Sequence, residues 1–327
     1  MALDLSCAFA TSMESHEHAR IAEDLGYKRA WFYDSPALYP DVWVQLCRAA
    51  ERTQHIGLGP GVLVPSLRHP MVNAAAIASL VSIAGPGRVA VGIGSGFTGR
   101  LTMGRRPMKW SDVGYYVRVL RALLRGEEVE WEGGAIRMLH PEGYGASRPI
   151  EVPFVIAAAG PKGLAVAREL GDGVFGAVMP LGGFSWSIAL TLGTVLAEGE
   201  DPASARALVA AGHAAAVMFH AALEQRRLDV VPRGKEWAAA YDAVPARVRH
   251  LALHDKHLIA INDRDRPFVT GEMLVENGFA LTRAGWRERI AMLESAGATE
   301  IAYQPAGSNI AKELANFASA VQGEGSP

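Results

Sequence analysis

The sequence contains little cysteine: Cys7 and Cys47 stand alone among 327 residues. Both lie inside apolar patterns rather than at paired spacings, so neither a disulfide framework nor a cysteine-based metal site is expected. His254 and His257 are three residues apart, but no further ligand completes a set for zinc. We therefore predict two buried free thiols, no metal site and a cytoplasmic location.

The chain also lacks a strong net charge. Its formal charge is -2 at pH 7, half of its residues are apolar and 20% are charged, which is the composition of a globular protein. No bulk electrostatic field draws such a protein to nucleic acid or to acidic lipids. We expect a small-molecule partner, with no nucleic acid and no membrane.

Long apolar runs are missing as well. The longest, 71–85 and 207–223, are rich in Ala and interrupted by polar residues such as Asn73 and His213, so neither is expected to reach the length of a membrane helix. The N-terminal residues carry no positive leader and include Asp4 within their apolar stretch, which argues against a signal peptide.

Short apolar segments alternate with amphipathic segments of helical length, as in parallel strands joined by crossover helices. Eight segments are typical of strands, which is the number in a (β/α)8 barrel. We predict an α/β fold, a TIM barrel that spans residues 1–327 as a single domain, although a doubly wound sheet would give a similar rhythm. The predicted strands are 3–9, 29–33, 56–64, 89–94, 153–158, 174–179, 208–218 and 300–305.

Gly26, Gly171 and Gly297 each follow a helical segment and precede a buried strand, so a left-handed residue is expected to end the helix at each. Two stretches break the rhythm and are predicted insertions. Residues 128–139 read as a small hairpin, and residues 224–281 are polar and contain Pro, His and Arg. A last helix is expected near 309–322.

One predicted strand has glycines at positions 57, 59 and 61, followed by Arg-His-Pro and an Ala-rich helix. Interior glycines weaken a strand, so we expect something to approach this backbone closely. That neighbour is either a ligand or a tightly packed helix.

A second glycine motif, Gly94, Gly96 and Gly99, satisfies G-x-G-x-x-G after a strand. No helix is expected to start there, because Gly104 and Pro107 follow. A Rossmann site is therefore disfavoured.

A third motif runs from a strand through Ala159-Gly160-Pro161-Lys162-Gly163 into a helix. Amides at a helix N-terminus bind anions, Pro161 suits the first turn, and Gly160 lets a phosphate approach the backbone. The motif predicts a phosphate cradle, with a plain strand-to-helix turn as the alternative.

Taken in order, GPGVLVPSLRHP, GRVAVGIGSG, YYVRVLRALLRGEEVEWEG and AAAGPKGLAVARELGDGV resemble the luciferase-like monooxygenase superfamily. They are most similar to its methylenetetrahydromethanopterin reductase branch. The resemblance covers nearly the whole chain and is weakest between 185 and 280. It implies a (β/α)8 barrel that holds a flavin or deazaflavin noncovalently at the C-terminal mouth of its strands.

The resemblance also implies site residues. A non-prolyl cis peptide is expected at Gly61-Val62, packed against the cofactor ring, and Ser95 and Gly96 are expected to line the cofactor groove. The phosphate would lie against the backbone of the third glycine motif, where a helix begins after strand 153–158. The residues of this cradle are Ala159, Gly160, Pro161, Lys162 and Gly163.

Proton donors that deazaflavin members often carry are missing, because Ser35 and Phe97 occupy those positions. Asp34 and His69 remain as candidate catalytic residues for proton handling, since each follows a strand. Asp34 alternatively caps a helix, and His69 alternatively braces its turn.

Two further groups suggest binding surfaces. A basic run after the fourth strand suits an anionic cofactor tail, or is simply a solvated loop; it comprises Arg100, Arg105, Arg106 and Lys109. Aromatic residues near the second strand suit a substrate pocket, with at least one of them in the core; they are Trp31, Phe32, Tyr33, Tyr39 and Trp43.

The resemblance predicts an oxidoreductase that transfers hydride between coenzyme F420 or FMN and a small organic substrate. The alternatives are an FMN-dependent monooxygenase that receives reduced flavin from a separate flavin reductase, and a non-catalytic flavin-binding protein. A phosphosugar aldolase or isomerase barrel would show a catalytic Lys or Glu at a strand end, and none stands out. Family resemblance also implies a homodimer.

Overall fold

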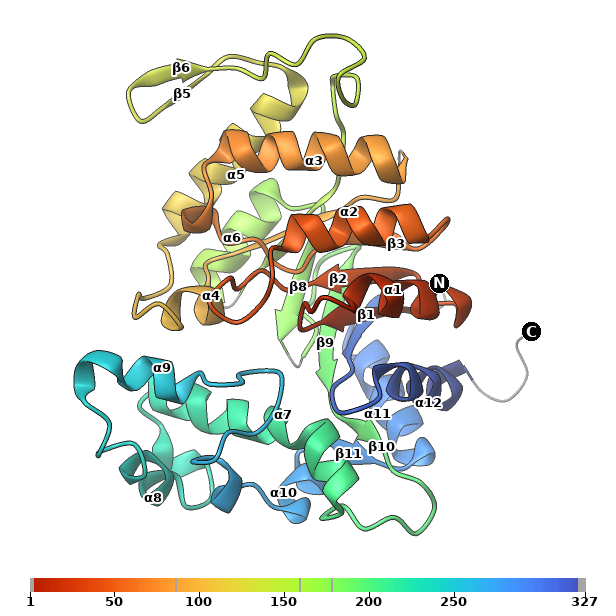
Figure 1. The fold of residues 1–327 in the computed structure, drawn as a ribbon, viewed down its shortest axis with the longest axis vertical. Coiled ribbons are helices and arrows are strands. Elements are labelled where there is room, and N and C mark those ends of the chain that lie inside the picture. Colours follow the sequence, from red (N-terminus) through yellow and green to blue (C-terminus); the bar gives the residue numbers. More distant parts are fainter. Residues whose placement is uncertain (1–2, 86, 159, 178, 323–327) are drawn as a thin grey trace.

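The computed structural model describes residues 3–85, 87–158, 160–177 and 179–322. Eight parallel strands form one sheet in the order β3-β2-β1-β12-β9-β8-β7-β4, and isolated parallel bridges at Leu58–Val89 and Leu63–Ile93 join β3 to the β4 side (Figure 1). These bridges close the sheet, so the predicted (β/α)8 barrel is confirmed. Its strands are β1 Asp4–Phe9, β2 Arg29–Phe32, β3 Gly57–Pro60, β4 Val91–Gly94, β7 Phe154–Ala157, β8 Gly173–Ala177, β9 Ser187–Leu192 and β12 Glu300–Gln304.

One predicted strand was wrong. Residues 208–218 belong to helix α7 (Ala205–Glu224), whose N-terminus is capped by the Ser204 hydroxyl accepting from Ala207 N. Alanine has the highest helix propensity and is the commonest residue of this segment, so an apolar run was mistaken for a buried strand. The missing barrel strand is β9, which pairs with β8 and β12.

Helices cover the outside of the barrel (Figure 1). All but α12, which follows the last strand, lie in connections between strands, and most carry one buried face against the sheet. They are α1 Ser15–Asp24, α2 Val42–Arg52, α3 Pro70–Ala84, α5 Trp110–Arg125, α6 Gly160–Leu170, α11 Arg283–Ser295 and α12 Ile310–Gln322, with the short α4 Phe97–Leu101 and a 3-10 turn at Pro65–Leu67.

The glycine prediction holds at two of three junctions. Gly26 and Gly297 have φ angles of 80° and 99°, as a left-handed helix end requires. Gly171 is not left-handed. A Cβ there would lie 2.7 Å from Ala167 O and 2.9 Å from Gly173 O, so close backbone approach explains this glycine instead.

The chain leaves the barrel twice. An antiparallel hairpin of β5 (Val129–Trp131) and β6 (Gly134–Ile136) follows α5. A longer excursion, residues 193–281, joins β9 to α11; it begins at β10 (Thr194–Val195), returns at β11 (Ala280–Leu281) and includes α7, so it starts earlier than predicted. Its other elements are α8 Gly234–Ala239, α9 Arg249–Leu253 and α10 Gly271–Glu276, with 3-10 turns at Leu228–Val230, Ala246–Val248 and Arg266–Phe268.

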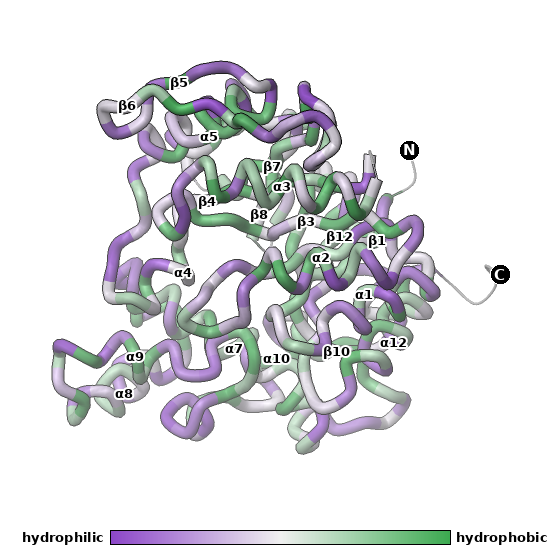
Figure 2. The backbone as a smooth tube through the Cα atoms, turned by 45° about the horizontal axis from the view of Figure 1, so that its top comes forward, coloured by the Kyte–Doolittle hydropathy of each residue, from purple (hydrophilic) through white to green (hydrophobic). Residues whose placement is uncertain are grey.

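Apolar residues gather in separate clusters. One lies inside the barrel and includes Trp31 and Phe175, a second lies between the strands and the outer helices, and a third belongs to the excursion, around Phe219 and Trp237. Figure 2 shows hydrophobic backbone along β4 and β7 inside the molecule. We propose that barrel and excursion form one domain, because the excursion packs on the ends of the strands.

Helix α7 is, within the described residues, the helix that is long and apolar enough to cross a membrane by length and composition. At 20 residues it exceeds the length that the sequence led us to expect. In the structure 67% of its most apolar window is buried inside the protein, as in the core helix of a folded domain.

Candidate functional site

The C-terminal ends of the strands face the excursion. In Figure 1 the arrowheads of β8 and β9 point toward it, and α4 lies at the same end of the barrel. Strands β4 and β7 are neighbours, with Gly94 opposite Ala157. The segment Ser95–Gly96 and the start of α6 follow these two strands directly, so they lie side by side at this mouth.

Atoms of the protein itself approach the glycine-rich strand β3. A Cβ at Gly59 would collide with Ala90 O, and a Cβ at Gly61 would lie 2.8 Å from the Cβ of Trp31. The close protein neighbours belong to adjacent strands rather than to the helix that the sequence suggested as one alternative. The peptide between Gly61 and Val62 is cis, which confirms that prediction.

Val62 turns toward strand β4. A Cβ at Gly92 or Gly94 would lie 2.8 or 2.9 Å from a methyl group of Val62. The glycines of β4 therefore make the room in which the Val62 side chain lies. Val62 is half-buried, packs against the cluster inside the barrel and follows the end of β3, so it lies near the mouth.

The start of α6 offers an open backbone. Gly160 has a φ of 72°, and no atom lies within 4 Å of where its Cβ would be. Pro161 and Lys162 are exposed. Gly163 is buried, and a Cβ there would lie 2.7 Å from the indole of Trp110 at the start of α5. Ala159, also predicted for this cradle, lies outside the described residues.

A short helix, α4, starts at Phe97, where no helix was expected. Gly96 precedes it with a φ of 84°, and Ser95 O accepts from Met108 N at 2.8 Å. The five-residue helix ends before Gly104 and Pro107, which hid it in the sequence. The strand order is that of a barrel and not of a doubly wound sheet, so the disfavoured Rossmann site has no support in the fold.

The basic residues after β4 differ in their surroundings. Arg100 donates from Nε to Arg106 O at 2.6 Å and from Nη1 to Ser66 Oγ, so its side chain holds the loop together. Arg105 and Lys109 are exposed. Lys109 immediately precedes Trp110, which packs on Gly163, so it lies at the α5 end that borders the α6 cradle.

Asp34, at the end of β2, is buried in an ion pair. Its carboxyl accepts from Arg68 Nη1 at 2.6 Å, and its side chain is 1% exposed. Burial raises the pKa of the Asp34 carboxyl, and the Arg68 guanidinium opposes that rise. The capping interpretation was wrong, because the cap of α2 is Asp41, which accepts from Trp43 N and Val44 N.

A hydrogen-bonded network fixes Arg68, which sequence reasoning missed. Tyr116 Oη donates to Arg68 O at 3.0 Å, and Asn73 Nδ2 donates to Tyr116 Oη at 2.7 Å. Trp43 Nε1 donates to Asn73 Oδ1 at 2.9 Å. The nearest signal in the sequence was the segment Arg68-His69-Pro70, in which His69 rather than Arg68 was the predicted site residue.

His69 makes the contacts of a helix cap. Its Nδ1 accepts from Met71 N at 3.1 Å, and its exposed ring meets Trp131 of the hairpin edge-on at 5.7 Å. Pro70 then begins α3. His69 follows Arg68 in the chain, but among its contacts within the described residues there is none between its ring and Asp34.

The aromatic residues near β2 are all buried, so their expected role as a pocket wall gives way to structural contacts. Tyr33 Oη donates to Gln304 Oε1 at 2.9 Å, and Gln304 Nε2 donates to Leu258 O at 2.7 Å. Tyr39 Oη donates to His257 O at 3.1 Å. The excursion is therefore tied across the mouth at residues 257–258, a contact that the sequence did not predict.

Both cysteines are free thiols. Cys7 is buried, as predicted, whereas Cys47 is only half-buried. Among residues 3–322, apart from those the structure leaves undescribed, no group of three or more His, Cys, Asp or Glu side chains is arranged to hold a metal ion.

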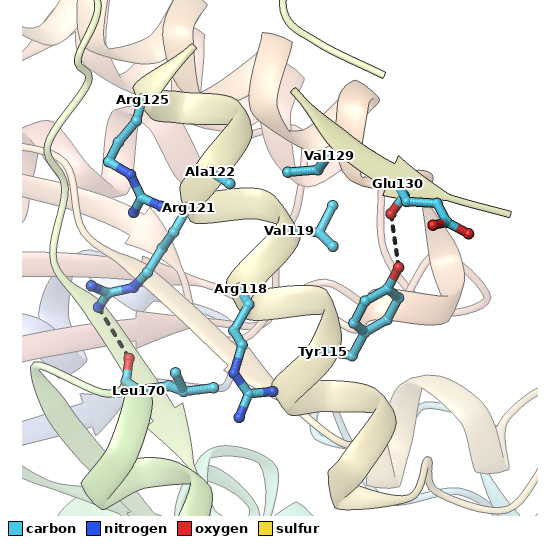
Figure 3. A pocket seen from close by; sticks show the side chains of 9 residues that line it. All are labelled: Tyr115, Arg118, Val119, Arg121, Ala122, Arg125, Val129, Glu130 and Leu170. Carbon is cyan, nitrogen blue, oxygen red and sulfur yellow. Dashed lines mark hydrogen bonds between the residues drawn. The ribbon is translucent and has the colours of Figure 1, made fainter. Parts of the chain in front are cut away.

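Two surface grooves lie away from this mouth. One, of about 700 Å³, runs along the outer face of α5 beside the hairpin (Figure 3). There Tyr115 Oη donates to Glu130 O and Arg121 Nη2 to Leu170 O. The other, of about 460 Å³, lies on α2 and α3. Both lie on the outside of the helical layer, away from the C-terminal ends of the strands, so we place the candidate site at the mouth.

A family model described as luciferase-like monooxygenase matches residues 11–300. The chain is 33% identical over 174 residues to a 5,10-methylenetetrahydromethanopterin reductase of Archaeoglobus fulgidus, a match that covers 51% of this chain and 50% of that protein. The match thus spans about half of that relative's length.

Two solved structures share the fold. The coenzyme F420-dependent tetrahydromethanopterin reductase of Methanopyrus kandleri superposes with a TM-score of 0.67 at 19% identity, covering 98% of this chain and 99% of that one. The oxygenating constituent of 3,6-diketocamphane monooxygenase from Pseudomonas putida, in complex with FMN, gives a TM-score of 0.61 at 13% identity, with coverage of 98% and 99%.

Proposed function

Because the chain belongs to the luciferase-like monooxygenase family, we propose that it is an oxidoreductase that uses a flavin or deazaflavin held without a covalent bond. More specifically, we propose hydride transfer between coenzyme F420, or FMN, and a small organic substrate. The similarity to the reductases named above favours F420.

The observation that carries this proposal is the adjacency of two glycine segments. Ser95–Gly96 after β4 and Gly160–Gly163 after β7 follow paired strands, at the end of a barrel where active sites form. The first amides of α6 have no partner within the helix, and the helix dipole favours an anion there. Open space at Gly160 leaves room for a phosphate group.

The residues present fit such a cofactor. The backbone of Gly160, Pro161 and Gly163, together with Lys162, would hold its phosphate, and Gly61, Val62, Ser95 and Gly96 would line the ring. When bound, the cofactor supplies the acceptor or donor of hydride. The protein would position the substrate and exclude water, a task for which the excursion across the mouth is suited.

For proton handling we propose Asp34. Its buried carboxyl has a raised pKa, which is the environment in which enzymes keep acid–base groups. His69 was the other candidate from the sequence. Because its Nδ1 caps α3 and its ring rests on Trp131, we propose a structural role for it.

The main alternative is an FMN-dependent monooxygenase supplied by a separate reductase, in line with the similarity to the FMN-bound monooxygenase fold. Oxygen uptake separates the two. We expect the protein to bind F420. We also expect reduced FMN to consume oxygen at the same rate with the protein as without it. Protein-dependent oxygen uptake would instead favour the monooxygenase.

We further propose that the protein acts in the cytoplasm as a homodimer. Two free cysteines suit a reducing compartment. Size-exclusion chromatography with light scattering would measure the assembly directly, and a monomeric mass would contradict the dimer.

A further inference from the structure

A row of hydrogen-bonding side chains runs from inside the excursion to helix α4. His220 Nε2 lies 3.2 Å from Asp265 Oδ2, and His220 Nδ1 lies 2.9 Å from His257 Nδ1. His257 Nε2 in turn lies 3.4 Å from Thr98 Oγ1. Four residues are thus aligned, and the two imidazole rings lie edge to edge, with centroids 5.0 Å apart and an angle of 17° between their planes.

The carboxyl of Asp265 fixes one end of this row. Its Oδ1 accepts from Trp237 Nε1 and Tyr241 Oη, both at 2.7 Å, and its Oδ2 accepts from Asn262 Nδ2 at 2.9 Å. A carboxylate surrounded by donors is an acceptor only. His220 must therefore carry its proton on Nε2 and donate it to Oδ2.

This assignment determines the next ring. With its proton on Nε2, neutral His220 offers a lone pair at Nδ1, so His257 must donate from its own Nδ1. His257 Nε2 is then left with a lone pair that faces the Thr98 hydroxyl. The unprotonated nitrogen of His257, which can accept a proton, thus faces helix α4.

Thr98 lies at the mouth of the barrel. It follows Gly96 and Phe97, and a Cβ at the next residue, Gly99, would lie 3.3 Å from both Asp34 O and Ser35 Oγ. Thr98 is half-buried, whereas His257 is 3% exposed. The hydroxyl is therefore the member of the row that can meet a molecule bound beside Ser95–Gly96.

The surroundings keep His257 neutral. Burial lowers its pKa well below the ordinary value, and the neighbouring rings of His220, His254 and His213 lower it further. These rings come from α7 and from the segment after α9, and Asp265 is the carboxylate that faces them. A neutral imidazole is the form that accepts a proton.

We propose that Asp265, His220, His257 and Thr98 form a proton relay serving the barrel mouth, as a second proton-handling group opposite Asp34. The proposal rests on the hydride-transfer function. As hydride leaves the substrate for the bound cofactor, a bond between hydrogen and a substrate heteroatom breaks. That proton goes to Thr98 Oγ1, the Thr98 proton goes to His257 Nε2, and the imidazolium is stabilised by His220 and Asp265. The reverse reaction runs the same steps backward.

The first test is the pattern of imidazole tautomers in the ¹⁵N-histidine-labelled full chain, measured by NMR at pH 7.5. We expect His220 protonated on Nε2 and His257 on Nδ1. His254 is a matched control, because its Nδ1 lies 2.8 Å from His250 O and so carries the proton too, without contact to Thr98. A His257 ring protonated on Nε2 would overturn the relay.

The same sample is then titrated with F420 and, separately, with FMN. We expect the His257 Nε2 resonance to shift on binding and that of His254 Nε2 to stay nearly constant. Binding seen by absorbance with no shift at His257 would overturn the relay while leaving the proposed function in place. Failure of both cofactors to bind would contradict the proposed function itself and, with it, the relay's role.

Asp265→Asn tests the direction of the relay. The new amide group would donate to His220 Nε2, which moves the His220 proton to Nδ1 and the His257 proton to Nε2. Asp263→Asn, exposed on the same segment, should leave both tautomers unchanged. Unchanged tautomers in Asp265→Asn would overturn the assignment.

Asp265 is buried, so its substitution can also disturb folding. Thr98→Val provides a second test of the relay, because Thr98 is half-buried and Val has the same shape. We expect hydride transfer to slow by on the order of 100-fold, with cofactor affinity unchanged. A Thr98→Val rate within about threefold of the parent, far below that range, would overturn a relay through this hydroxyl.

Discussion

Arg68 holds the carboxyl of Asp34 at 2.6 Å, and the same guanidinium donates to Asp41 at 2.8 Å. The two acids differ in exposure, because the side chain of Asp34 is 1% exposed and that of Asp41 is 46% exposed. One arginine thus links the end of β2 to the cap of α2.

Asp34→Asn should affect both stability and rate. Because the buried ion pair loses its charge, we expect the free energy of unfolding to fall by about 3 kcal/mol. If Asp34 handles a proton, hydride transfer should also slow by about 100- to 10,000-fold. Urea unfolding and single-turnover kinetics measure the two effects.

Asp41→Asn is the matched control, since it removes the other partner of Arg68 and keeps a good N-cap. It should cost less than about 1 kcal/mol, as exposed ion pairs do. It should leave the rate unchanged. Equal rates for Asp34→Asn and Asp41→Asn would place Asp34 outside the chemistry.

Gly160→Val should weaken cofactor binding by at least about tenfold, which corresponds to about 1.4 kcal/mol. The added side chain would occupy the open space beside the α6 amides. Its φ of 72° adds a strain of about 1–2 kcal/mol. Gly199→Val is the control, because Gly199 has a φ of 71° and equally open surroundings. Equal cofactor affinity in the two variants would count against the cradle.

Gly59→Ala should destabilise the fold by about 1–3 kcal/mol, because its Cβ would collide with the rigid backbone oxygen of Ala90. Gly134→Ala in the exposed hairpin, where the Cβ meets Trp131 O at 3.7 Å, should change stability by less than about 0.5 kcal/mol. Chemical denaturation compares them. A neutral Gly59→Ala would mean that β3 is not packed as described.

Acid should destabilise the protein through His213. Burial lowers the pKa of His213 to about 4, and neither ring nitrogen has a partner within the described residues. The unfolded chain, with a pKa near 6.5, binds the proton more readily, so stability is present above about pH 6.5 and is lost as pH falls toward 4. The full loss is about 3 kcal/mol.

His213→Leu removes this titrating group. We expect its stability to fall less steeply than that of the parent between pH 6.5 and pH 4.5, measured by urea unfolding at several pH values. Identical slopes for the parent and the variant would show that His213 is not buried in the neutral form.

Much of the fold was predictable because the strands and the junction glycines carry local signals. Seven predicted strands match the barrel, and the hairpin expected within 128–139 forms, with its turn at Glu132 and Gly133. Helix α7 failed because an alanine-rich run has the apolarity of a buried strand, and periodicity does not separate the two. Because 208–218 was counted as one of the eight strands, β9 was not predicted.

The site was predictable only where the backbone determines it. In the candidate site, glycine motifs pointed to the unusual backbone that the structure has at Gly61, Gly96 and Gly160, because such backbone geometry favours glycine. The Asp34–Arg68 pair and the row that ends at Thr98 join residues far apart in the chain. Side-chain contacts of that kind leave no periodic or short-range pattern in a single sequence.

The central claim, that this mouth binds a flavin or deazaflavin, is tested most directly by spectroscopic titration of the purified protein with F420 and with FMN. We predict saturable binding of one of them, with F420 favoured, accompanied by a change in the absorbance or fluorescence of the ring. Gly160→Val should bind at least about tenfold more weakly. No saturable binding of either cofactor to the folded protein would contradict the account.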